Sequence, residues 1–130
     1  MKRLFIPLAA IILLSGCRES IEERAAREAR EMTETKCPMP VGDNMYLDSI
    51  VFDIPSHTQS QYFRVEGELD NDSVFEGVDT RGLLLKELKN TPSYVTLVKR
   101  GVFFHYVYRS ASDPEHTLLE LTLTPEDYGK

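Results

Sequence analysis

The residues of this chain that could carry chemistry are three histidines, two cysteines and an acidic run. The histidines are His57, His105 and His116, and none has a second histidine or a cysteine at the spacing of a metal site. No Gly-x-Ser-x-Gly segment presents a serine nucleophile on a sharp turn. A glycine-rich phosphate-binding loop is also absent from the sequence. We therefore assign no catalytic residue, no metal ligand and no cofactor.

A histidine beside a carboxylate is the arrangement that could still support hydrolysis. His105 and Glu120 lie in two neighbouring strands expected from the sequence, so their side chains can meet across a hairpin. A small hydrolase that uses His57, His105 or His116 with a nearby carboxylate is thus an alternative hypothesis. It requires two titratable groups to converge in a pocket.

The acidic run consists of alternating carboxylates, which an extended backbone would place on one face of a strand: Glu66, Glu68, Asp70 and Asp72. Calcium binds clusters of this kind, but the run lacks the glycine and the closing glutamate of an EF-hand loop. We expect an acidic strand end that resists edge-to-edge pairing, and no metal site.

The N-terminus has the three parts of a secretory signal peptide. Met1-Lys2-Arg3 is basic, residues 4–14 are apolar apart from Pro7, and small residues follow. This apolar run is too short to span a bilayer, which takes about 20 residues. Cleavage of residues 1–16 would leave 114 residues, enough for one domain. The formal charge would fall from −6 to −8, because the removed segment carries two basic and no acidic residues.

The segment Leu14-Ser15-Gly16-Cys17 resembles the lipobox of bacterial lipoproteins. The resemblance implies cleavage between Gly16 and Cys17 and acylation of Cys17, with palmitate as an expected acyl group. Two or more acyl chains make a stable membrane anchor, whereas one chain binds only marginally. In many Gram-negative lipoproteins an aspartate after the cysteine favours the inner membrane. Because Arg18 follows here, the resemblance implies the outer membrane and the periplasm.

The second cysteine, Cys37, has three possible roles if Cys17 carries lipid: a buried apolar residue, one half of an intermolecular disulfide, or a reactive thiol. Without lipidation, Cys17 would be an ordinary structural thiol, and a Cys17–Cys37 disulfide becomes possible. The helix expected between them would hold the two about 28 Å apart, against about 6 Å in a disulfide. Lipidation with a single remaining thiol is the simpler interpretation.

The helix after the anchor is predicted from a capping box at Ser20-Ile21-Glu22-Glu23 and should run to about Thr35. Opposite charges at i, i+4 support it. Its apolar stripe is thin, comprising Ile21, Ala25, Ala29 and Met32. We expect its C-terminal half to dock on a sheet, with a solvated spacer as the alternative.

Alternating apolar residues predict four strands, at residues 45–54, 60–69, 102–109 and 117–124. Between the second and the third, the leucines of residues 83–88 predict a helix, and Thr91-Pro92 begins a second short one. The predicted class is α+β: an N-terminal helix, then ββ-α(α)-ββ with a four-stranded antiparallel sheet covered by helices on one face. The expected divisions are residues 1–16 (signal peptide), 17–36 (lipidated tether and charged helix) and 37–130 (one α+β domain).

The uncovered face of such a sheet should carry aromatic and charged side chains, among them Tyr62, Arg64, His105 and Arg109. A face of this kind is either half-solvated or a partner surface. We take these four residues as a candidate binding face.

Several segments of residues 37–128 resemble small bacterial envelope proteins of uncharacterised function: Cys37-Pro38-Met39, Leu47-Asp48-Ser49, Gly101 to Arg109, and Leu121 to Tyr128. The resemblance implies one α+β domain and no catalytic residue. The order of helix and strands also resembles the cystatin arrangement of a helix on a sheet, which implies nothing about function.

The sequence thus predicts a lipid-anchored cell-envelope protein that acts without catalysis, as a binding or accessory module for another envelope protein. The lipid on Cys17 would hold it to the membrane. Nucleic acid is excluded as a partner because the mature chain is acidic and has no basic patch. Besides the hydrolase, a structural lipoprotein whose helix oligomerises is an alternative, although the thin alanine-rich stripe is unlike a coiled coil.

Overall fold

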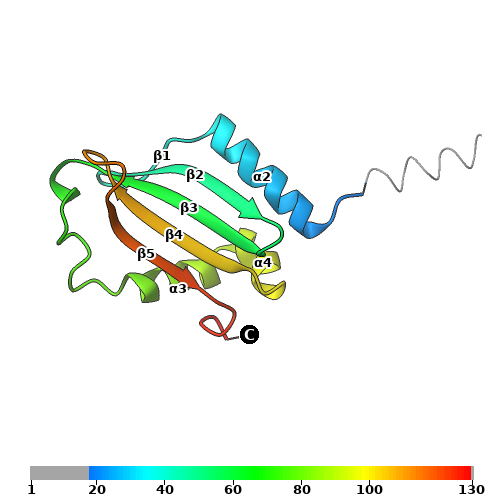
Figure 1. Ribbon diagram of the computed structural model, residues 1–130. Coiled ribbons are helices and arrows are strands. Elements are labelled where there is room, and N and C mark those ends of the chain that lie inside the picture. Colours follow the sequence, from blue (N-terminus) through cyan, green and yellow to red (C-terminus); the bar gives the residue numbers. More distant parts are fainter. Residues whose placement is uncertain (1–17, 130) are drawn as a thin grey trace, which may run out of the picture.

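The computed structural model describes residues 18–129, so the signal peptide and Cys17 lie outside the described residues. The chain forms a five-stranded mixed sheet with helices against it (Figure 1). The elements are α2 (Ile21–Thr35), β1 (Met39–Gly42), β2 (Met45–Asp53), β3 (Thr58–Val65), η1 (Gly67–Leu69), α3 (Thr80–Asn90), η2 (Pro92–Tyr94), α4 (Val95–Lys99), β4 (Phe103–Ser110) and β5 (Thr117–Leu123). Within residues 18–129, no helix has the length and apolar character needed to cross a bilayer.

Helix α2 begins and ends where the sequence predicts. The Ser20 hydroxyl accepts a hydrogen bond from the Glu23 amide at 3.0 Å, and the Glu23 carboxylate accepts one from the Ser20 amide at 2.8 Å. The helix docks on the sheet: Ala29 is buried, and the Thr33 hydroxyl both donates to the carbonyl and accepts from the amide of Ile50 in β2. The predicted docking of its C-terminal half is therefore confirmed.

The prediction of four antiparallel strands was wrong in two respects. The order is β1-β2-β3-β4-β5, and β3 pairs with β4 in parallel, with Thr58 opposite Phe103. Parallel neighbours need a long crossover connection, and the chain from η1 to α4 supplies it. The extra strand, β1, is a short edge strand that contains Pro40. An edge strand tolerates proline, but in a sequence a proline argues against a strand, so β1 was not predicted.

The acidic run does not form one face of a strand. Strand β3 ends at Val65, and Gly67, with a φ of +62°, turns the chain into η1. A positive φ costs glycine little, which explains its place here. Asp70 and Asp72 then follow in a loop, so the expected alternation of four carboxylates is broken by the turn.

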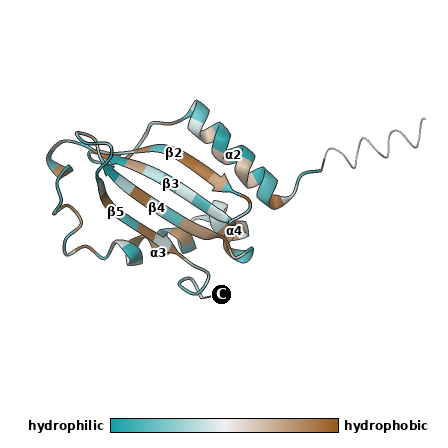
Figure 2. Cartoon of the chain, viewed as in Figure 1, coloured by the Kyte–Doolittle hydropathy of each residue, from teal (hydrophilic) through white to brown (hydrophobic). Residues whose placement is uncertain are grey.

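The hydrophobic core lies between the helices and one side of the sheet, which we call the covered face; the other side is the open face. Phe104 on the covered face is fully buried, whereas its neighbour Phe103 is 39% exposed. Figure 2 shows that hydrophobic (brown) and hydrophilic (teal) residues both occur along the strands. Helices α3 and α4 lie behind the sheet in the view of Figure 1, so the open face is towards the reader. The prediction that helices cover one face is confirmed.

Candidate binding groove and open sheet face

A groove of about 440 Å³ lies on the covered face, between α2 and the segment formed by η2 and α4; we call it the α2–α4 groove. Helix α2 contributes one wall, with the apolar residues Ile21, Ala25, Ala29 and Met32 and the ion-paired Arg24 and Glu28. The opposite wall is made by Ser93, Tyr94, Thr96 and Leu97. Ile50 and Gln59 line it from the sheet. The two alanines are one helical turn apart, so their small side chains leave this wall shallow.

The floor of the groove contains a buried polar atom without a partner. Gln59 is only 9% exposed, and no described residue donates a hydrogen bond to its side-chain oxygen, Oε1. Its neighbour two residues on, Gln61, donates instead to the Tyr94 hydroxyl at 3.4 Å. Leaving a buried acceptor unpaired costs about 1–3 kcal/mol. A ligand that supplies a donor here would recover part of that free energy.

A charged cluster at the start of α2 fixes the helix relative to α4 and to the turn between β2 and β3. The Arg100 guanidinium donates to the Glu22 carboxylate at 2.7 and 2.9 Å, and His57 Nε2 lies 3.0 Å from the same carboxylate. These bonds, those from Arg100 first, lower the pKa of Glu22 to about 2. The ion pair joins the first turn of α2 to the end of α4, next to Ile21 of the α2–α4 groove.

Each of the three histidines contacts one carboxylate, and the three contacts lie in separate parts of the fold. His57 meets Glu22 as described, and His116 meets Asp72, whose carboxylate raises the pKa of that imidazole. His105 lies between Ser60, at 2.8 Å from Nδ1, and Glu120, at 2.5 Å from Nε2. The expected cross-strand contact of His105 with Glu120 is therefore present.

The line of Ser60, His105 and Glu120 has the residue order of a hydrolytic triad. The Ser60 side chain, however, lies on the open face of β3, which is hydrogen-bonded to strands on both sides. The amide groups of β3 are therefore used by the sheet and cannot form an oxyanion hole. Neither of the two cavities described here is lined by a histidine.

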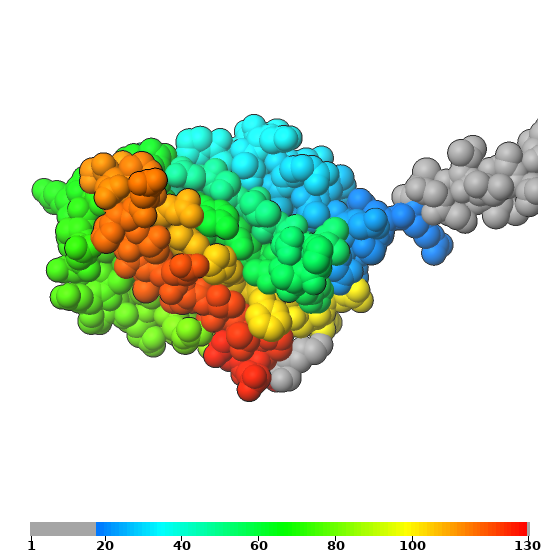
Figure 3. Space-filling view, in the orientation of Figure 1, coloured from blue at the N-terminus to red at the C-terminus, as the bar shows by residue number. Residues whose placement is uncertain are grey.

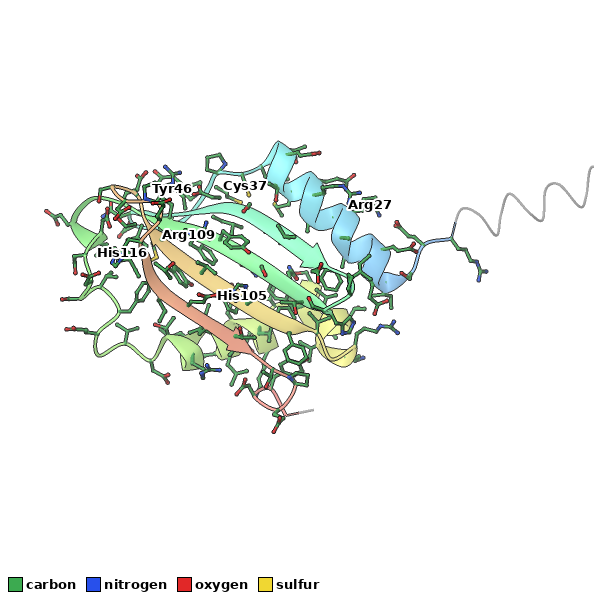
Figure 4. All side chains as sticks on the ribbon, in the orientation of Figure 1. Arg27, Cys37, Tyr46, His105, Arg109 and His116 are labelled. Atoms are coloured by element: carbon green, nitrogen blue, oxygen red, sulfur yellow. The ribbon has the colours of Figure 1, made fainter. Side chains whose placement is uncertain are left out.

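The four residues of the candidate binding face all lie on the open face, and three of them surround one cavity. Tyr62, Arg64 and Arg109 line a hollow of about 420 Å³, which we call the open-face cavity. The Arg109 guanidinium lies 5.0 Å from the centre of the Tyr62 ring. His105, the fourth residue, packs edge-on against Tyr62, with the two ring centres 6.2 Å apart. In Figure 4, Arg109 lies towards one end of the sheet and His105 lies nearer its middle.

Two parts of these sites were missed from the sequence. Tyr46, whose ring lies 4.7 Å from the Arg64 guanidinium, was placed in a strand but not in the face. The α2–α4 groove was not anticipated. The alternation along β3 places Gln59 and Gln61 on the same side as the buried Phe63. Two glutamines on an otherwise apolar face indicate a polar site in the interior, and this pattern could have been recognised in the sequence.

The acidic side chains and the thiol of Cys37 are the other groups considered for metal binding or reactivity. Within residues 18–129, no three histidine, cysteine or acidic side chains gather as a metal site. Asp70 instead accepts hydrogen bonds from the amide and hydroxyl of Ser112, at 3.0 and 2.8 Å. Cys37 is half-buried beside the core, and burial, assisted by Asp48, raises the pKa of its thiol. This disfavours the reactive thiolate.

Comparison with solved structures finds proteins with a similar fold. The fold is similar to a presumed secreted protein from Pseudomonas aeruginosa, with a TM-score of 0.64 and 9% identity over 85% of this chain and 99% of that chain. It is also similar to the type II secretion system pilotin AspS of Vibrio cholerae (TM-score 0.60, 11% identity, 82% of this chain and 90% of that chain). The type 2 secretion system pilotin EpsS of Vibrio vulnificus gives a TM-score of 0.53 at 12% identity, over 84% and 92%.

At these identities the likeness concerns the fold. None of the curated proteins compared with the sequence matches it. One family does match, across residues 20–119, which run from the cap of α2 into β5. The chain therefore belongs to the family described as a domain of unknown function, DUF8479.

Proposed function

We propose that this chain is a lipid-anchored accessory protein of the cell envelope, and that it binds a segment of another envelope protein in the α2–α4 groove. The observation that carries the proposal is the groove itself, whose walls mix apolar side chains with polar and charged ones and whose floor has an unpartnered acceptor. The fold shared with two type II secretion pilotins supports a role of this class. In this proposal the protein acts by binding and not by catalysis.

The anchor of the proposed protein is Cys17, acylated after cleavage at Gly16. The lipobox and the signal peptide before it support this step, and Arg18 favours the outer membrane. Helix α2 starts at Ile21, which also lines the groove. Only a few residues thus separate the lipid from the binding site, and the groove would be held close to the membrane surface.

The occupant of the groove would be an amphipathic segment of the partner, in the mode by which apolar anchors enter a hydrophobic groove. Its apolar side chains would enter between Ala25 and Leu97, and a donor on the segment would pair with Gln59 Oε1. The same contacts count against an oligomer built through α2, because Ala25 and Ala29 already pack on the chain's own sheet.

Filling the groove is expected to remove partner binding without unfolding the protein. In Ala25→Trp the indole would occupy the space between α2 and α4, so we expect envelope proteins that co-purify with the detergent-solubilised wild type to be lost. Leu83→Trp is the matched control, because Leu83 is 61% exposed on α3, away from the groove. Thermal unfolding of each variant verifies the fold. Co-purification that survives in Ala25→Trp, or that is lost equally in Leu83→Trp, would refute binding in the groove.

A further inference from the structure

We propose that the open-face cavity is a second binding site, which takes an acidic peptide segment and holds its carboxylate through Arg109. The cavity lies on the opposite side of the sheet from the α2–α4 groove and shares no lining residue with it. The inference therefore stands on different observations from those that support the groove.

The Arg109 guanidinium is positioned but not neutralised. It rests on the Tyr62 ring at 5.0 Å, and among residues 18–129 no carboxylate forms an ion pair with it. Stacking on an aromatic face uses the π-surface of the guanidinium and leaves its N–H groups free to donate. Unlike Arg64 beside it, which contacts two carboxylates, Arg109 is therefore able to donate to an incoming group.

The neighbour of Arg109 across the sheet is a second arginine. Arg64 and Arg109 are direct partners in the parallel register of β3 and β4. Like charges placed opposite each other destabilise a sheet. Arg64 is compensated, since its guanidinium lies 3.3 Å from Asp48 and 2.7 Å from Glu66. Glu66 does not line the cavity, so its charged lining residues, Asp48, Arg64 and Arg109, carry one positive charge in excess, which an incoming carboxylate would compensate.

The shape of the cavity suits a carboxylate on an extended chain. A bulge in β2 between Leu47 and Ser49 opens one wall, and the loop after β4, with Ala111 and Pro114, forms another. The hollow of about 420 Å³ is aromatic at Tyr62 and charged at Arg109, Arg64 and Asp48, and Asp48 is engaged by Arg64 at 3.3 Å. A guanidinium can hold a carboxylate through two parallel hydrogen bonds, which fixes both the position and the orientation of the ligand.

The location of the cavity favours a peptide over a lipid headgroup. Helix α2 starts beside His57, at the end of the sheet where Thr58 pairs with Phe103. Arg109 lies six residues further along β4, or about 20 Å at the rise of a strand. In Figure 3 the blue start of α2 lies at one end of the visible face and the orange loop after β4 towards the other end. On the proposed anchor at Cys17, the cavity therefore lies at the end of the sheet remote from the start of α2.

The test is a titration of the detergent-solubilised full chain with a hexaglutamate peptide, followed by NMR through the Nε–Hε signals of the arginines. We expect the Arg109 signal to shift, and Arg109→Gln to weaken binding about tenfold or more, as loss of a charged hydrogen-bonding partner does. Arg30→Gln is the matched control: it removes the same charge from an exposed position on α2. A hexaglutamine peptide should not bind.

Three outcomes would overturn the proposal. The first is no shift of the Arg109 signal in the wild type, which does not depend on how any variant folds. The second is an equal loss of affinity in Arg109→Gln and Arg30→Gln, which would indicate general electrostatic attraction. The third is stronger binding to phosphatidylglycerol vesicles than to hexaglutamate, with the vesicle binding abolished by Arg109→Gln, which would identify a headgroup site. Hexaglutamate binding that is unchanged in Ala25→Trp would show that this site is independent of the α2–α4 groove.

Discussion

Replacing Phe104 by alanine is expected to lower the free energy of unfolding by about 3–5 kcal/mol, a large part of the stability of a small domain. Phe104 is fully buried in β4, and its ring contacts two others edge-on: Tyr94 at 5.8 Å and Tyr128 at 6.2 Å between ring centres. Deleting it removes buried apolar surface and leaves a cavity that these rings cannot fill without moving. Because Tyr94 is also a wall of the α2–α4 groove, its displacement should weaken partner binding as well.

Chemical denaturation of the wild type beside Phe104→Ala and Phe103→Ala measures this effect. Phe103 is the matched control, since it is the adjacent residue of the same type and is 39% exposed on the open face. We expect a shift in the midpoint for Phe104→Ala several times larger than that for Phe103→Ala. Equal losses from the two substitutions would contradict the assignment of the covered and open faces.

Replacing Cys17 by serine is expected to move the protein from the membrane fraction to the soluble fraction. The substitution removes the thiol that the proposed lipid is attached to. Within residues 18–129 no helix could cross a bilayer, and the negative net charge gives little attraction to anionic headgroups. Intact mass and membrane partitioning of the natively expressed protein check this. The wild type should carry a mass increment of lipid size that Cys17→Ser lacks.

The matched control for the anchor is Cys37→Ser, which changes the other cysteine and should leave both the lipid mass and the membrane association intact. If the wild type and Cys17→Ser are both soluble and have the same lipid-free mass, the lipoprotein proposal is wrong. The possibility of a Cys17–Cys37 disulfide, and of a freely diffusing protein, would then have to be reconsidered.

Elements with local signals could be predicted from the sequence. Helix α2 was predicted at both ends because its cap is a reciprocal pair of hydrogen bonds between residues three apart, Ser20 and Glu23. The strands β2 to β5 were located because apolar residues alternate along them, and this alternation also placed Tyr62, Arg64, His105 and Arg109 on one face. The local pattern was sufficient for these positions.

Features that depend on distant packing could not be predicted in this way. Alternation in β3 and β4 is the same whether the two strands are parallel or antiparallel; the path of the chain through α3 and α4 decides between them. The α2–α4 groove has the same origin, because it exists only when α4 docks a fixed distance from α2. The ion pair of Glu22 with Arg100, which joins α2 to the end of α4, links residues 78 positions apart.

The central claim is that the α2–α4 groove holds a segment of an envelope protein, and crosslinking in the intact envelope tests it most directly. Benzoylphenylalanine would be introduced at residue 25, in the groove, or at residue 83, on the exposed side of α3. We expect a discrete protein adduct from residue 25 that residue 83 does not give. No adduct from residue 25, or the same adducts from both positions, would contradict the account.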